Sequence, residues 1–220
     1  MIKLSIPSRI MAILFFCTTL LLFSGNVLSL GHGERSGDKA MEGAYLVAEA
    51  DDVKKDKNGV KVSIPDLVLL NQEGKKIRFY SDLVKDKVVA INFIFTTCTT
   101  ACPLLSATFS NVQELMGDRF GRDVYLISIS VDPVIDTPER LKAMATKFHA
   151  RPGWTFVTGE REEIVKLLRA LGASALRKKD HTPLVLIGND TRGIWTRTNG
   201  LAQPVHLARL IDGMMNGVIE

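Results

Sequence analysis

Hydrophobic and polar positions along this chain follow patterns that change from segment to segment. Residues 88–95 form an apolar run with one polar member, Asn92, and are rich in β-branched and aromatic side chains. Such a run is typical of a strand that is buried on both faces of a sheet. Cys98 and Cys102 follow it, and an apolar pattern with helical spacing begins after Pro103. The two thiols are therefore predicted to lie where a central strand turns into a helix.

The remaining pattern predicts strands and helices in alternation. Apolar positions at 62–83, interrupted by a turn at 71–74, predict a β-hairpin before the central strand. Thr137 and Pro138 have the residue types of a helix N-cap and a first helical position. The other predicted elements are strands 124–131, 154–157, 184–187 and 194–196, and helices 104–116, 138–148, 164–171 and 205–214. This order predicts an α/β fold, a mixed sheet flanked by helices with an N-terminal β-hairpin.

The N-terminal part of the chain differs from the rest. Two basic residues precede an uncharged apolar run at residues 10–23. Because this run is short for a membrane span, residues 1–30 are predicted to be a signal peptide or a membrane anchor. Residues 31–59 are rich in small and charged side chains and predict a flexible tether, which leaves 60–220 as the folded domain. The expected location is extracytoplasmic, in the periplasm or on the inner membrane.

Charge and cysteine content narrow the functional classes. The net charge is +4 at pH 7 and no dense basic run occurs, which argues against nucleic-acid binding. Of the three cysteines, Cys17 lies in the N-terminal segment, so the folded domain has one pair. A single pair is typical of a redox or metal site. Thiolates select Cu(I) or zinc, and two of them at positions i and i+4 of a helix would lie on one face.

A histidine far along the chain is the candidate third ligand. His181 stands just before Pro183 and the predicted strand 184–187. The position of the cysteines is that of thioredoxin-like proteins, in which the loop before this strand lies against the cysteine loop. His181 could then reach both thiolates, with Asp180 orienting the imidazole, and such a site would bind Cu(I) or Cu(II). The cis and trans forms of the Thr182–Pro183 bond both stay open.

Three motifs occur together: T-T-C-T-T-A-C-P, then I-S-V-D-P-V-I-D-T-P, then D-H-T-P before a strand. Over about residues 60–218 the chain resembles the Sco/SenC family. The resemblance implies a thioredoxin-like, membrane-associated copper protein that assists assembly of the Cu-A centre of cytochrome c oxidase. It also implies that Cys98, Cys102 and His181 are the copper ligands. Asp132 and Asp136 match the second motif, and we expect turn and helix-capping roles for them, with support of the metal site as the alternative.

Two functions stay open at this stage. The first is a monomeric copper metallochaperone, not an enzyme, whose partner is the copper-bearing subunit of the oxidase or another copper chaperone. The second is a thiol–disulfide oxidoreductase that acts on cysteines of the oxidase or of other extracytoplasmic proteins, with Cys98 as nucleophile and Cys102 as resolving thiol. Pro183 stands where many family members have an aliphatic residue, and this departure favours the second function.

Overall fold

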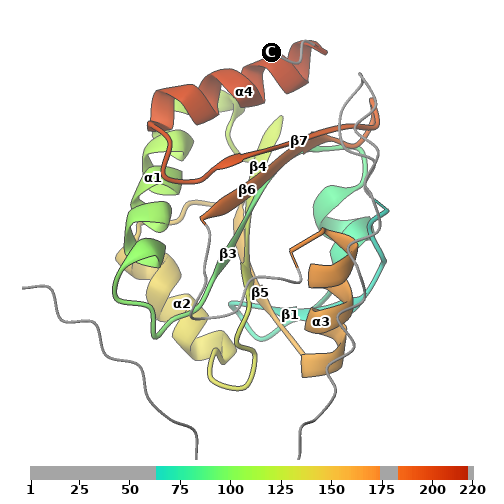
Figure 1. Cartoon of the computed structure of the whole chain (residues 1–220), viewed down its shortest axis with the longest axis vertical. Helices are drawn as coiled ribbons and strands as arrows, with labels where there is room; N and C mark the ends of the chain where they lie inside the picture. The colour runs from blue at the N-terminus through green and yellow to red at the C-terminus, as the bar shows by residue number, and fades with distance from the viewer. Residues whose placement is uncertain (1–62, 174–182, 218–220) are drawn as a thin grey trace, which may run out of the picture. The chain divides into compact units, whose positions relative to one another are not determined.

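The computed structural model of the chain describes residues 63–173 and 183–217, which lie in the second of two units, Ala48–Glu220. The described residues form one seven-stranded mixed sheet with helices on both faces (Figure 1). In spatial order the strands are β2 (Lys76–Arg78), β1 (Val68–Asn71), β5 (Trp154–Thr158), β4 (Val124–Ser130), β3 (Val88–Ile94), β6 (Leu184–Asn189) and β7 (Ile194–Asn199).

Strand β3 lies inside the sheet because both of its faces are apolar. Its side chains alternate between the two hydrophobic cores, and every one of its residues is buried. Burial of an aliphatic or aromatic side chain contributes about 1.5–3 kcal/mol, so a strand with two such faces is most stable in the interior. It pairs in parallel with β4 and antiparallel with β6, and β4 pairs in parallel with β5. The loops that follow β3 and β4 therefore leave the same edge of the sheet side by side.

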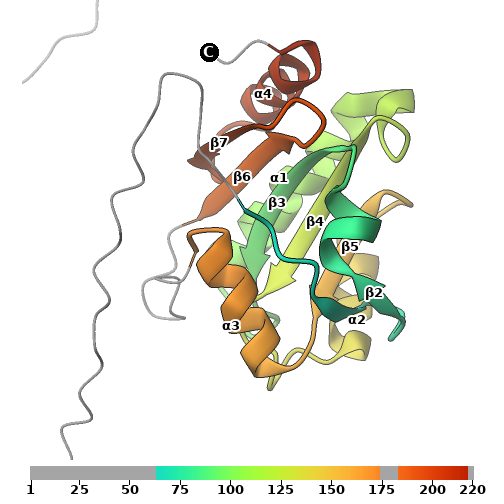
Figure 2. The same ribbon diagram turned by 90° about the vertical axis from the view of Figure 1, so that its right-hand side faces the viewer.

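Helices cover the two faces unequally (Figures 1 and 2). The described α-helices are α1 (Ala101–Met116), α2 (Pro138–Lys147), α3 (Arg161–Ala170) and α4 (Pro204–Asn216). Buried side chains of α1, α2 and α4 belong to one core, and those of α3 belong to the other, together with the π-helical turn η1 (Phe79–Val84). Thr137 caps α2 by accepting a hydrogen bond from the Arg140 N–H (3.4 Å), and Pro138 is its first residue, as predicted.

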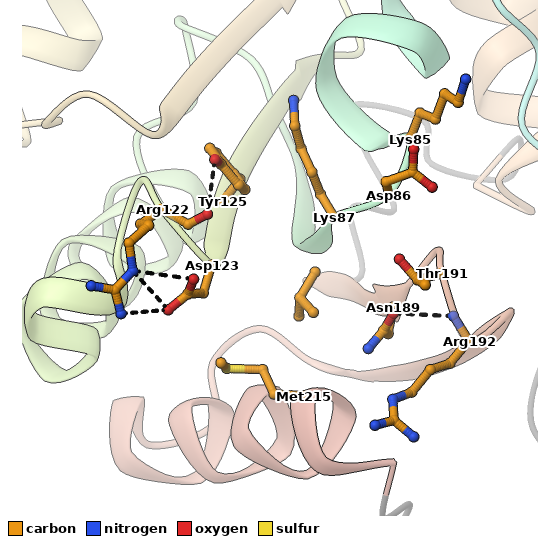
Figure 3. A pocket seen from close by; sticks show the side chains of 11 residues that line it. Lys85, Asp86, Lys87, Arg122, Asp123, Tyr125, Asn189, Thr191, Arg192 and Met215 are labelled. Atoms are coloured by element: carbon orange, nitrogen blue, oxygen red, sulfur yellow. Dashed lines mark hydrogen bonds and ion pairs between the residues drawn. The ribbon is translucent and has the colours of Figure 1, made fainter.

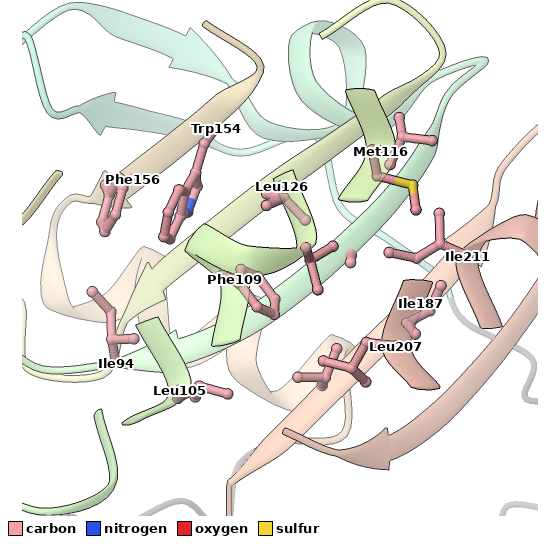
Figure 4. Close-up of a cluster of buried hydrophobic side chains, with 14 of the residues drawn as sticks. Ile94, Leu105, Phe109, Met116, Leu126, Trp154, Phe156, Ile187, Leu207 and Ile211 are labelled. Carbon is pink, nitrogen blue, oxygen red and sulfur yellow. The ribbon is translucent and has the colours of Figure 1, made fainter. Parts of the chain in front are cut away.

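The larger core fixes α1 against the sheet (Figure 4). The ring of Trp154 stacks on Phe156 with 5.0 Å between centroids and lies 5.9 Å from that of Phe109 on α1. The indole N–H of Trp154 donates to the Ser128 hydroxyl at 2.9 Å, which satisfies a polar group at the centre of the core. This packing leaves α1 little freedom to move relative to the ends of β3 and β4.

The predicted order of strands and helices is confirmed, but the N-terminal hairpin is shorter than expected. Its first strand begins at Val68, and the expected return segment divides into β2 and η1. The side chain of Asp66 accepts hydrogen bonds from the N–H (3.0 Å) and hydroxyl (2.7 Å) of Ser81, which hold the chain in a helical turn there. None of the helices in the described ranges is long and apolar enough to span a bilayer.

Candidate metal centre

The cysteine pair lies at the carboxyl end of β3, in the loop that leads into α1. Cys102 is fully buried in the first turn of α1, whereas Cys98 precedes the helix and is half-buried. The predicted helical i, i+4 geometry is therefore wrong for Cys98. The loop instead curls back, so that the Cys98 sulfur accepts a hydrogen bond from the Cys102 backbone N–H at 3.3 Å. Both cysteines are free thiols, and they meet through this turn.

The Cys98 sulfur also acts as the cap of α1. The N-cap residue of this helix, Thr100, makes no side-chain capping hydrogen bond. The first N–H groups of a helix lack partners within the helix and carry a partial positive charge. The sulfur of Cys98 satisfies one of these groups, and a thiolate at that position is stabilised by the helix.

The two thiols differ in acidity. Burial acts to raise the pKa of Cys98, but hydrogen bonds from Cys102 and Thr100 outweigh it and leave the pKa below the ordinary thiol value. Burial raises the pKa of Cys102 to about 12, and the hydrogen bond to Cys98 and the negative charge of Asp136 act in the same direction. Cys98 is therefore the accessible, more acidic thiol, and Cys102 is the buried thiol that holds its proton.

Asp136 connects the loop after β4 to the cysteine loop. Its side chain is fully buried. One carboxylate oxygen accepts hydrogen bonds from the N–H (3.0 Å) and the hydroxyl (2.6 Å) of Thr96, and the other accepts from the Ser130 hydroxyl (2.6 Å). The expected helix-capping role belongs to Thr137 instead, and Asp136 holds the backbone two residues before Cys98.

Asp132 has the turn role that its position predicts. Its carbonyl oxygen accepts hydrogen bonds from the N–H groups of Ile135 (3.0 Å) and Asp136 (2.9 Å). Its own N–H donates to the Ser130 hydroxyl at 3.0 Å, so Ser130 contacts both aspartates. A further backbone bond, from Val131 N–H to the Ile94 carbonyl (2.9 Å), joins the two loops at their start. The turn thereby positions the Asp136 carboxylate against Thr96 of the cysteine loop.

The predicted third ligand, His181, lies outside the described residues, as do Asp180 and Thr182, so the isomer of the Thr182–Pro183 bond is a prediction only. Pro183 is the first described residue after that gap. Its carbonyl accepts a hydrogen bond from the Gly200 N–H at 2.7 Å. Gly200 in turn lies against α1, since a β-carbon there would come within 2.2 Å of the Leu105 side chain.

The described ranges hold two of the three predicted copper ligands. No group of three or more His, Cys, Asp or Glu side chains within 63–173 and 183–217 is arranged to hold a metal. The two sulfurs are present, and the third predicted ligand, His181, is not within these ranges. The donor set itself, two adjacent thiols, suits a soft ion such as Cu(I).

A pocket of about 270 Å³ opens beside Cys98, which the sequence analysis did not anticipate. It lies between the cysteine loop and α2, whose Arg140, Met144 and Lys147 line one wall. Their i, i+4, i+7 spacing places them on one face of α2 and was the signal available in the sequence. The Cys98 sulfur thus lies beside a pocket that is already present in the folded domain.

A larger pocket, of about 590 Å³, lies at the opposite end of β3 (Figure 3). Four basic residues line it, but Arg122 forms an ion pair with Asp123 (2.8 Å). Lys87 contacts the Asp82 carbonyl and lies over the Tyr125 ring, 4.9 Å from its centroid. Since Arg122 is paired with a carboxylate and no cysteine of the described ranges lines this pocket, the cysteine end is the better candidate for chemistry.

Comparison with known proteins identifies the family of the chain. The SCO1/SenC family model matches residues 55–216. A SCO1 protein homolog of Bacillus subtilis (strain 168) is 31% identical over 124 residues, which are 56% of this chain and 63%, less than two thirds, of the relative.

Solved structures with the same fold include two with 26% sequence identity. BsSco, described as a member of the Sco family of cytochrome c oxidase assembly proteins with a disulfide switch, has a TM-score of 0.61 over 74% of this chain and 99% of that chain. Bradyrhizobium japonicum ScoI with copper bound has a TM-score of 0.57 over 69% of this chain and 99% of that chain. The mixed sheet flanked by helices is thus the thioredoxin-like fold of Sco structures. Since the family model matches well over half of the sequence, the chain belongs to the SCO1/SenC family.

Proposed function

We propose that this protein binds copper through Cys98 and Cys102 and delivers it during assembly of the Cu-A centre of cytochrome c oxidase. The hydrogen-bonded pair of free thiols at the end of β3 carries this proposal. The copper-bound ScoI of Bradyrhizobium japonicum and the oxidase-assembly role stated for BsSco support it. This function would place the domain outside the cytoplasm, as residues 1–30 predict.

The unequal thiols fit the needs of a carrier. Copper binds thiolates, so its arrival displaces the Cys102 proton, which is held by burial. The buried sulfur then retains the ion, while the half-buried Cys98 sulfur is the ligand that an incoming partner thiolate can replace. Asp136 keeps the loop in place through Thr96 during this exchange.

His181 is the proposed third ligand, with Asp180 as its orienting partner. Two residues of extended chain span at most about 7 Å, so His181 stays close to Pro183. In the register of β6 with β3, Val185 pairs with Asn92, so Pro183 comes level with Ile94, near the start of the cysteine loop. This register supports the proposal that the imidazole reaches the two sulfurs.

Thiol–disulfide exchange is the second candidate function, and the difference in acidity between the thiols favours it. The Cys98 thiolate would attack a partner disulfide, forming a mixed disulfide and releasing one partner thiolate. Cys102 would then lose its proton and attack the Cys98 sulfur, releasing the second partner thiolate. The pair would be oxidised to a disulfide and the partner reduced by two electrons. The disulfide switch reported for BsSco supports this chemistry.

Copper titration of the purified, reduced full chain tests the first proposal. We expect one copper per chain, loss of binding in Cys98→Ser and Cys102→Ser, and weaker binding in His181→Ala. His206→Ala is the matched control, since this histidine is exposed on α4. A wild-type protein that takes up no stoichiometric copper but reduces a partner disulfide would reject the first function in favour of the second.

A further inference from the structure

The pocket beside Cys98 combines an apolar interior with a basic rim. Its volume of about 270 Å³ is below the range of typical small-molecule sites, about 300–1,000 Å³, and suits one or two side chains. Apolar groups come from both walls, and Arg140 and Lys147 of α2 are exposed. The lining residues other than these two are Thr96, Cys98, Pro103, Ala143, Met144 and Phe148.

The charge of the rim is not neutralised by the described part of the chain. Among the described residues neither Arg140 nor Lys147 forms an ion pair; Arg140 bonds the Ile135 carbonyl (3.3 Å) and Lys147 lies 5.5 Å from the centroid of the Phe148 ring. The adjacent Glu139 makes a hydrogen bond with Thr137, and Asp136 is buried. The rim therefore carries two positive charges that no ion pair within the described ranges neutralises.

We propose that this pocket docks an acidic, extended segment of the partner polypeptide that carries the thiol to be exchanged with Cys98. The inference rests on the proposed function, since it names the partner surface for the same sulfur. Arg140 and Lys147 are seven residues apart, about 10 Å along a helix at 1.5 Å per residue. An extended chain covers that distance in about three residues at roughly 3.3 Å each. An acidic segment of about four residues thus spans the distance between the two cations, with an apolar side chain and the cysteine between its carboxylates.

Two synthetic peptides test this geometry without copper. Each places leucine and cysteine between two like charges, Glu-Leu-Cys-Glu or Lys-Leu-Cys-Lys, with the cysteine linked by a disulfide to thionitrobenzoate. The Cys98 thiolate of the full-length Cys17→Ser, Cys102→Ser variant, in which Cys98 is the remaining cysteine, attacks the peptide sulfur. The peptide–thionitrobenzoate bond breaks, thionitrobenzoate leaves as a thiolate, and a Cys98–peptide disulfide forms. The rate is followed by thionitrobenzoate release, and the adduct by mass spectrometry.

We expect the acidic peptide to react about tenfold faster than the basic one at low ionic strength, with most of the preference lost in concentrated salt. Adding Arg140→Glu and Lys147→Glu should reverse the preference. Lys142→Glu is the control for Lys147→Glu, because it makes the same charge change on the same helix outside the pocket. If the rim with Arg140→Glu and Lys147→Glu showed the same preference between the two peptides as the unchanged rim, the proposal would be overturned.

A second variant tests whether the apolar lining of the pocket contributes to docking of the peptide. Ala143→Trp fills the pocket from an exposed position on α2 and should slow both peptides severalfold, whereas Lys142→Trp, an exposed neighbour outside the pocket, should leave both rates unchanged. Unchanged peptide rates would show that the pocket is not used. Because every readout is copper-free, a protein that binds no copper could still show the charge preference. The failures of the two proposals are thus distinguishable.

Discussion

Each end of strand β3 borders a pocket, and the two differ in how their polar groups are used. At the start of β3 the pocket is large, about 590 Å³, and its charged residues Arg122 and Asp123 pair with each other on the surface. At the carboxyl end the pocket is small, about 270 Å³, but the Cys98 thiol lines it, and Cys98 and Thr96 in its wall bond to the buried Cys102 and Asp136. Cavity size alone would favour the start of β3, whereas buried polar groups held by specific partners favour the carboxyl end, where we propose the copper site.

Of the changes considered for the two ends of β3, removal of the buried Cys102 thiol should have the largest effect, a loss of copper affinity. Cys102→Ser replaces a sulfur ligand by a hydroxyl, and we expect copper affinity to fall by more than the about 10–100-fold seen when residues outside a ligand set are changed. Competition titration against a copper chelator measures the loss. Near-normal affinity would show that the thiols are not the ligands.

Asp136→Ala should have the next largest effect, a loss of stability of the folded domain. The substitution leaves the hydroxyls of Thr96 and Ser130 without their buried acceptor, and loss of such a network costs about 3–5 kcal/mol. Urea unfolding of the metal-free protein measures the change in the free energy of unfolding. Asp136→Asn, which keeps the shape of the side chain, should lose less of the free energy of unfolding. Equal stability of both variants and wild type would show that Asp136 does not hold the β3 and β4 loops together.

Copper affinity should fall as the pH falls. A metal that binds a thiolate competes with protons below the pKa, and the pKa of Cys102 is raised to about 12 while that of Cys98 is lowered. Between those two pKa values one proton is displaced, so affinity should drop about tenfold per pH unit, and more steeply below the Cys98 pKa. Titrations at a series of pH values check the slope. A flat profile would exclude a buried protonated thiol as ligand.

Arg122→Ala, at the opposite end of β3, should have the smallest effect. Its partner Asp123 is on the surface, where ion pairs add little. Copper affinity and the urea midpoint should match wild type within error. A clear loss of copper binding would mean that the two ends of β3 are coupled.

Much of this arrangement could be predicted from local patterns. The two-sided apolar run of β3 and the Thr137–Pro138 helix start depend on neighbouring residues, and both are confirmed. The geometry of Cys98 was not predictable from spacing, because the same four-residue interval fits a helix and a turn that closes on an N–H. The partners of Asp136 include Thr96, 40 residues away, so its role appears only once the β3 and β4 loops lie together.

The sulfur cap of α1 has a consequence for spectroscopy. The Cys102 N–H points at the Cys98 sulfur, so any bond that this sulfur makes to copper or to another sulfur withdraws electron density from the accepting lone pair. The amide resonance of Cys102 is therefore expected to move with each such event. One backbone nucleus inside the protein would distinguish its reduced, oxidised and loaded forms without an added label.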